Sequence, residues 1–410
     1  MSTTMKHLIQ NILLLAILLV PATFIACSNE DTVNDQLPVI NTYALTVQAS
    51  KGSDVATARA LSLSGTTLNA TWAIGEAVTV YNVTKSADLG GTLSAQTNGS
   101  STTLSGMLTG SIEVNDELTL KFLNPAYSTQ DGTLTGNATS IDKVCDYATA
   151  TVTVTSVSGG NVTTTAASFV NQQAIVKFTL KDKADGSTLL SATQLVVSAG
   201  GNSYTVTPTP AASELYVAIS GISSQDVTLT ATVGSDTYEY KKTEATFVNG
   251  KYYTINVMMT RLAKAADLGK VMAQNGCIYD NNAAATTAGT TAVGVIAYVG
   301  NDSGCQHGLA LALADESGIR TFTKAGEAAG DHADVADYIW RVPTKTDWEK
   351  MTTYLTAHHQ SLVNGNYWSS TTSGTDNAYC ATISSGGDAI DVTQVQDKQT
   401  ELNVRAVLAF

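Results

Sequence analysis

The sequence predicts a mainly β protein in which two tandem β-sandwiches are followed by an α+β domain. Charged residues make up only 14% of the 410 positions, whereas Thr, Ser, Ala, Val and Gly are abundant. This composition favours many short strands joined by small-residue turns. Between the N-terminal segment and residue 262, no stretch of sequence shows helical periodicity of any length. At about 100–200 residues per domain, the length is typical of two or three domains.

The N-terminus has the pattern of a lipoprotein signal peptide, which we expect to cover residues 1–26. Lys6 precedes an apolar run, and the segment Phe24–Ala26 leads directly to Cys27. The apolar run is shorter than the about 20 residues that span a bilayer, so a lipid such as palmitate on Cys27 would anchor the protein. Residues 27–42 would then form an acidic tether at the outer membrane and cell surface. The alternative is simple secretion with an incidental cysteine.

The net charge of −13 argues against nucleic-acid binding, which needs clustered positive charge. The cysteines show no Cys-x-x-Cys spacing, and the sequence indicates no cofactor and no metal site. Cys145 falls in the first predicted sandwich. Cys277, Cys305 and Cys380 fall in the last domain, where one disulfide and three free buried thiols are both compatible with the sequence.

The first sandwich is expected over residues 43–167. Residues 43–49 alternate apolar and polar side chains, which predicts an opening strand. A turn at Gly75 leads to Val78 and Val80, which alternate into a core, and further short strands follow between Gly- and Asn-containing turns.

The second sandwich is expected over residues 168–262. Its first strand is predicted over Phe169–Leu180, and Ile255 and Val257 mark its last strand. About seven short strands at hairpin spacing fit in this segment, which suits one sandwich.

Three motifs of these regions resemble those of the fimbrillin family, the subunits of type V pili. They are Trp72–Tyr81, Phe169–Phe178 and Val248–Ile255, and they follow the lipoprotein signal in that order. The resemblance implies two tandem β-sandwiches of transthyretin-like type, and other pilus subunits as partners.

The same resemblance implies that an Arg-specific protease removes the first strand and that a neighbouring subunit's donor strand replaces it. Arg59 is the expected cleavage point, because it lies in a small and polar stretch of the kind that proteases cut. Leu45 and Val47 would be the plugs of the displaced strand, and an extended strand would add to the exposed edges. The alternative is that Arg59 is an ordinary surface residue.

The last domain is expected over residues 263–410. Thr344 and Asp347 have the spacing of a capping box, and Trp348, Met351 and Leu355 share the face of the helix that follows. The final residues alternate apolar side chains, which predicts a core strand at the C-terminus. In polymerising fimbrillins the C-terminus donates the onward strand. Because a different domain follows residue 262 here, we expect a subunit at one end of a fibre, a tip subunit.

This domain resembles a bacterial C-type-lectin-like domain in four motifs. They are Gly308–Ala312, Trp340–Thr344, Tyr367–Ser370 and Arg405–Phe410. The resemblance places a ligand face between the tryptophan strand and the last strand. The candidate ligand residues there are Thr371, Thr372, Asp376, Asn377, Tyr379, Asp388, Asp391 and Gln394. Small polar residues with an occasional Tyr suit an adaptable binding face, although a solvated loop region has the same composition.

Taken together, these patterns favour a pilus tip adhesin or accessory fimbrial subunit that binds a host or microbial ligand and is not an enzyme. One alternative is a surface lipoprotein that binds glycan or protein without polymerising. A second alternative is an enzyme of the lectin-like sulfatase-modifying fold, which needs a reactive cysteine pair among Cys277, Cys305 and Cys380. The signatures of calcium-dependent lectins are absent from the sequence.

Overall fold

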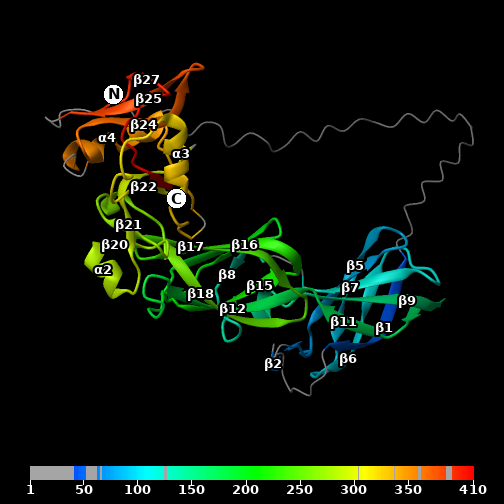
Figure 1. The fold of residues 1–410 in the computed structure, drawn as a ribbon. Coiled ribbons are helices and arrows are strands. Elements are labelled where there is room, and N and C mark those ends of the chain that lie inside the picture. The colour runs from blue at the N-terminus through cyan, green and yellow to red at the C-terminus, as the bar shows by residue number, and fades with distance from the viewer. Residues whose placement is uncertain are drawn as a thin grey trace, which may run out of the picture. The chain divides into compact units, whose positions relative to one another are not determined.

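A computed structural model describes residues 41–51, 62–64, 67–123, 127–302, 304–336, 338–358, 362–384 and 390–410 (Figure 1). The described strands form two eight-stranded sheets, a six-stranded sheet, a four-stranded sheet and a two-stranded hairpin. The predicted mainly β fold is therefore confirmed. No helix in the described part of the chain has both the length and the apolar character needed to cross a membrane.

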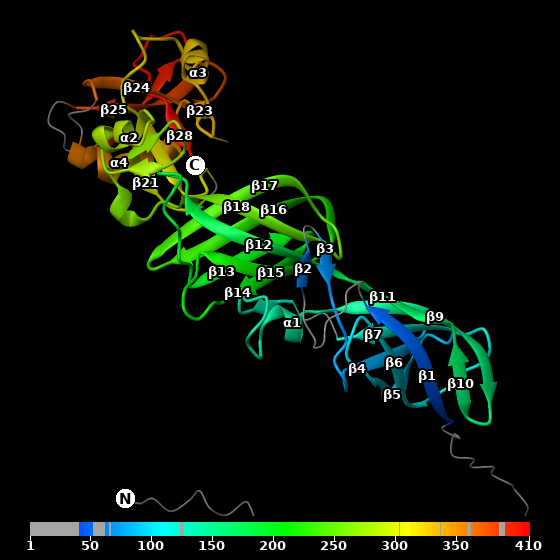
Figure 2. The same cartoon turned by 90° about the horizontal axis from the view of Figure 1, so that it is seen from below.

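The first eight-stranded sheet closes on itself, and β1 is the strand that closes it. β1 pairs antiparallel with β6 along one edge and parallel with β10 and then β11 along the other (Figure 2). The strands of this sheet are β1 (Thr42–Lys51), β4 (Ala77–Asn82), β5 (Ala87–Ala95), β6 (Ser101–Thr109), β7 (Glu117–Phe122), β9 (Ala148–Ser158), β10 (Asn161–Thr164) and β11 (Ala167–Asn171). β2 (Ser62–Ser64) and β3 (Thr67–Asn69) form the separate hairpin.

The second eight-stranded sheet contains seven consecutive strands after residue 172, as the sequence predicted, together with one strand from earlier in the chain. Its order is β15-β12-β18-β17-β16-β13-β14-β8. The bounds are β8 (Thr129–Gln130), β12 (Gln173–Asp182), β13 (Gln194–Ala199), β14 (Asn202–Val206), β15 (Glu214–Ser220), β16 (Ile222–Val233), β17 (Asp236–Phe247) and β18 (Tyr252–Arg261).

The strand predicted over Phe169–Leu180 is two strands in the structure. Residues up to Asn171 belong to β11 in the first sheet, and residues from Gln173 belong to β12 in the second. The side chain of Phe169 consequently lies in the first core, whereas Ile175 and Val176 lie in the second. The boundary expected between residues 167 and 168 thus falls inside β11.

A segment between β7 and β9 crosses from the first sheet into the second core, which the sequence did not predict. Gln130 imitates a backbone partner there: its side-chain amide donates to the carbonyl of Ala218 at 2.8 Å and accepts from the N–H of Ala218 at 2.8 Å. Helix α1 (Ile141–Val144) interrupts the region expected to lack helix. Cys145 is buried in the second core, so its assignment to the first sandwich was wrong.

Residues after Arg261 form sheets of their own. The six-stranded sheet has the order β20-β19-β21-β22-β28-β23 and draws every strand from residues 271–409. Its strands are β19 (Val271–Ala273), β20 (Ile278–Tyr279), β21 (Ala292–Val299), β22 (Gly308–Ala312), β23 (Trp340–Arg341) and β28 (Val407–Ala409). The four-stranded sheet contains β24 (Gly365–Ser373), β25 (Asn377–Ile383), β26 (Ile390–Asp391) and β27 (Val395–Asp397). The described helices after Arg261 are α2 (Asn282–Thr287), α3 (Phe322–Gly330), α4 (Lys345–His358) and the 3₁₀ turn Ala265–Asp267.

Helix α4 begins with the reciprocal capping that its sequence predicts. The N–H of Asp347 donates to Oγ1 of Thr344 at 3.0 Å, and the N–H of Thr344 donates to Oδ2 of Asp347 at 2.7 Å. Trp348, Met351 and Leu355 are buried on one face, so the predicted helix is confirmed.

Asp347 is itself buried and forms an ion pair with Arg341. Burial alone would raise the pKa of the Asp347 carboxyl. The ion pair with Arg341 and the hydrogen bonds from Thr344 outweigh burial, so the pKa lies below its ordinary value. Because the folded pKa is depressed, the carboxylate stabilises the fold above its unfolded pKa of about 4, and this stabilisation disappears as the pH falls through the folded pKa.

We therefore expect Asp347→Ala to lower the free energy of unfolding by about 1–3 kcal/mol at pH 7, through loss of the cap and of the buried partner of Arg341. The difference from wild type should shrink as the pH is lowered from 6 to 3, which urea unfolding at several pH values measures. Glu349→Ala on the exposed side of the same helix is the control and should change stability by less than about 0.5 kcal/mol. A difference that stays constant with pH would contradict the role of the ionised carboxylate.

Candidate functional site

The first candidate site is the slot that β1 occupies. Along β1, the inward side chains of Leu45, Val47 and Ala49 are each at most 3% exposed. The residues between them face solvent. This alternation is the period of two that a half-buried strand requires, and it fits the apolar core built by β4, β6, β7 and β9.

The pairing of β1 shows what the slot offers to an extended segment. Nine residues of β1, from Thr42 to Ser50, pair in register with β6. On the other edge, Ala44–Thr46 pair with β10 and Ala49–Lys51 pair with β11. Without β1, both edges would present unpaired N–H and C=O groups beside an apolar channel, which is the arrangement that captures an added strand.

Three residues of the predicted sites lie outside the described part of the chain. Cys27 belongs to the N-terminal segment, Arg59 follows the end of β1, and Asp388 precedes β26. Lipidation at Cys27 and cleavage at Arg59 therefore remain predictions.

The second candidate site is the predicted ligand face of the terminal domain, where the structure places the other seven candidates. Thr371 and Thr372 lie on β24, Asn377 and Tyr379 on β25, and Asp376 between these two strands. Asp391 ends β26, and Gln394 precedes β27. β25 pairs with all three other strands of this sheet, so these residues share one small sheet and its connections.

Within this face, some side chains are exposed to solvent, whereas Asp391 forms hydrogen bonds within its own turn. Thr372, Asp376, Asn377 and Gln394 are exposed to solvent. Asp391 accepts hydrogen bonds from the N–H and Oγ1 of Thr393 and from the amide of Gln394, which lower the pKa of its carboxyl. Asp391 therefore orders its own turn, and the exposed residues are the ones available to a ligand.

Tyr379 and Thr371 are half-buried and hold the start of α4 against the face. The ammonium of Lys345 lies 4.6 Å from the centre of the Tyr379 ring, and the N–H of Lys345 donates to Oγ1 of Thr371 at 2.9 Å. These contacts attach the sheet to the start of α4.

The cysteines needed by the enzyme alternative do not form a reactive pair. Cys277, Cys305 and Cys380 are free, buried thiols that belong to three different packed clusters. Burial raises the pKa of Cys277 to about 11 and also raises the pKa values of Cys305 and Cys380. Because the thiolate is the nucleophile, burial and raised pKa values oppose nucleophilic reactivity at these cysteines.

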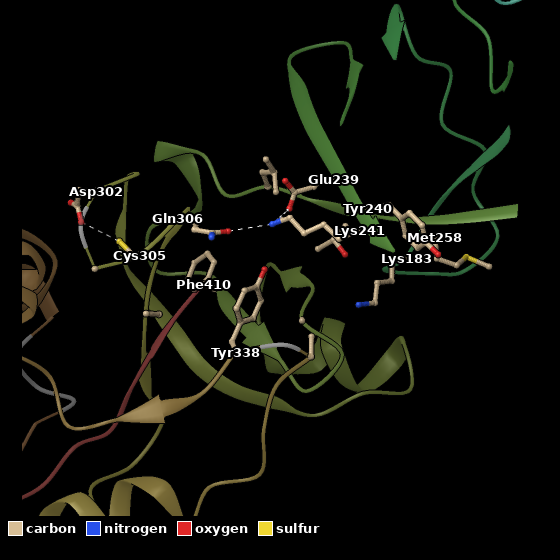
Figure 3. Close-up of a pocket in the computed structure, with 16 residues that line it drawn as sticks. Lys183, Glu239, Tyr240, Lys241, Met258, Asp302, Cys305, Gln306, Tyr338 and Phe410 are labelled. Carbon is tan, nitrogen blue, oxygen red and sulfur yellow. Dashed lines mark hydrogen bonds and ion pairs between the residues drawn. The ribbon is translucent and has the colours of Figure 1, made fainter. Parts of the chain in front are cut away.

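A third candidate site is a cavity of about 730 Å³ beside β17 and β18 (Figure 3). Lys183 and Lys241 extend into it, and the rings of Tyr338 and Phe410 meet edge to face at 6.1 Å in its wall. Lys241 donates to Gln306 at 3.3 Å. The volume is in the range of small-molecule sites, about 300–1,000 Å³. Sequence reasoning missed this cavity because its lining comes from segments more than 200 residues apart.

Neither the protein-family models nor the curated proteins gave a match. Among solved structures, a "putative cell adhesion protein" from Bacteroides ovatus aligns at 16% identity over 54% of this chain and 95% of its own, with a TM-score of 0.31. A fimbrial assembly protein from Parabacteroides distasonis aligns at 15% identity over 54% and 94%, with a TM-score of 0.28. The shaft pilin SpaA from Lactobacillus rhamnosus GG aligns at 13% identity over 55% and 100%, with a TM-score of 0.23. TM-scores this low do not establish a shared fold or a shared role.

The burial of the inward side chains of β1 predicts how much each contributes to the free energy of unfolding. Leu45→Ala should lower the free energy of unfolding by about 2–5 kcal/mol, because it removes buried methyl groups and leaves a cavity. Chemical unfolding followed by tryptophan fluorescence measures this, since Trp72 lies in the same core. Met107→Ala on the neighbouring β6 is the matched control, because Met107 is 56% exposed and its loss should cost less than about 0.5 kcal/mol. Equal losses for the two variants would show that β1 is not a packed part of the core.

Proposed function

We propose that the protein is a surface-displayed fimbrial subunit of the tip or accessory type, with a ligand-binding terminal domain. In this proposal, cleavage near Arg59 frees β1, and a donor strand from a neighbouring pilus subunit takes its place. The observation that carries the proposal is the double pairing of β1, which closes the first sheet alone and is followed directly by the segment that contains Arg59. A single strand can therefore leave without dismantling the pairings among β4, β5, β6, β7 and β9.

The arrangement of the terminal domain supports a binding role at the end of the assembly. After Arg261 the chain enters sheets of its own, and β28 lies between β22 and β23 in the six-stranded sheet. Val407 and Leu408 of β28 are both fully buried. This strand is therefore held on both edges and both faces, and it is not a segment that can be passed to a neighbour. We propose lipid attachment at Cys27 as the anchor of the precursor at the outer membrane.

Treatment of the full-length chain with an Arg-specific protease tests the exchange of β1. We expect cleavage at Arg59, identified by mass spectrometry, followed by uptake of a labelled peptide of residues 41–51 into the slot. Uncut protein should take up none, because its own β1 stays covalently attached at high effective concentration. The Arg59→Ala variant is the control and should show neither event. Complete cleavage at Arg59 without peptide uptake would favour the alternative, a surface binder with a fixed first strand.

The ligand is proposed to be a glycan or protein bound at the exposed part of the terminal face. A glycan and protein array probed with the whole chain should identify it. The double variant Thr372→Arg/Asn377→Arg should then weaken binding at least about tenfold, because two bulky cations would occupy the contact surface. Tyr338→Ala, in the cavity of Figure 3, should leave the affinity unchanged. The reverse result would move the ligand site from the face to the cavity.

A further inference from the structure

The last residue of β1 carries a charge into the core. Lys51 continues the inward series of Leu45, Val47 and Ala49, because the alternation of the strand places every second residue on the buried face. Its side chain is 1% exposed, and it pairs with Phe169 of β11. Lysine is almost never fully buried unless it is paired. Its surroundings must therefore be built to receive an ammonium group.

Those surroundings include one carboxylate and two aromatic rings. The ammonium of Lys51 donates to Oδ2 of Asp146 at 2.7 Å, and both side chains are at most 2% exposed. It also lies 3.5 Å from the centre of the Phe122 ring and 5.2 Å from that of Trp72. We call Asp146, Phe122 and Trp72, together with Phe169, whose ring packs against Trp72, the lysine cage.

The rings of the cage hold one another in place. Trp72 meets Phe122 edge to face at 5.5 Å and meets Phe169 in the same way at 5.0 Å. Because aromatic faces carry partial negative charge, they attract a cation that is shielded from water. All four members of the cage lie on segments other than β1. The cage would consequently remain in the protein if β1 were removed.

Loss of β1 would leave this cage unfilled. Asp146 is 1% exposed, and its Oδ1 has no hydrogen-bond partner among the described residues. An ionised carboxylate that loses its partner in such surroundings is strongly unfavourable. A strand that enters without a cation would leave the carboxylate buried and uncompensated.

We propose that the lysine cage selects the donor strand, which must carry a lysine six residues after the first inward apolar residue, at the place of Lys51. The inference rests on the proposed exchange of β1. The partner is thus an extended segment with apolar side chains at the places of Leu45, Val47 and Ala49, and a primary ammonium group at the end. Arginine fits less well, because its planar guanidinium is larger than the ammonium that lies against Phe122.

Competition among synthetic strands tests the selection. Full-length protein cut at Arg59 is mixed with labelled, C-terminally amidated peptides of residues 41–51 that carry Lys, Arg, Met or Glu at position 51. We expect the affinities to fall in that order, with the Met peptide weaker than the Lys peptide on the order of 100-fold. A Lys51 peptide with Gln48→Glu is the matched control. It lowers the peptide charge by one, as Lys51→Met does, but at an exposed position, so its affinity should match that of the Lys peptide.

A variant of the receiving protein provides the second arm. Asp146→Asn should reduce the preference for Lys over Met at least about tenfold, since the two changes act on the same ion pair. If this variant does not fold, the peptide series on the native protein still decides the question.

The outcomes separate the cage from the exchange itself. Equal affinity of the Lys and Met peptides would overturn the cage as a selector and leave the exchange of β1 intact. Failure of every peptide, including the native sequence, to enter a fully cleaved protein would overturn the proposed function, and the inference would fall with it.

Discussion

The hydrogen bonding of β1 along both of its edges is the constraint on which the first core depends. Most sheets end in edge strands that are protected by charge, proline or a covering segment. Here one ten-residue strand joins β6 to β10 and β11 and removes both edges at once. The same strand supplies the inner side chains that fill the channel, so closure of the sheet and completion of the core are one event.

This dependence links the local sequence to the proposed assembly. The alternation of β1 makes it an inserted strand. The cleavage proposed near Arg59, between β1 and β2 in the sequence, would release this strand alone. The lysine cage adds selectivity to an otherwise general mode of recognition. Main-chain hydrogen bonds accept any extended segment, whereas a buried carboxylate accepts only one that carries a positive charge.

Much of this organisation is encoded in short-range patterns. The period of two in residues 43–49 and the Thr344–Asp347 capping pair predicted the strand and the helix that the structure contains. The split of Phe169–Leu180 into β11 and β12 could not be predicted, because both halves alternate in the same way and only their partners in different sheets distinguish them.

Contacts between residues far apart in the sequence could likewise not be predicted. The alternation of β1 predicts that Lys51 points inward like Leu45. It does not predict the ion pair with Asp146, which is 95 residues away in the sequence. The pairing of Gln130 with Ala218 spans 88 residues and leaves no periodic signal. The lining of the cavity includes Lys183 and Phe410, which lie far apart in the sequence. A local sequence pattern cannot predict that two such residues come together.

The segment that carries Gln130 also has a mechanical meaning. The chain leaves the first sheet after β7, enters the second core with Tyr127 and Ile141, and returns through Cys145 to β9 before crossing once more between β11 and β12. The chain therefore connects the two sheets at several places, and the buried hydrogen bonds between Gln130 and Ala218 add a further connection. A pulling force is shared among these connections instead of passing through one linker. A joint of this kind resists stretching between the two eight-stranded sheets.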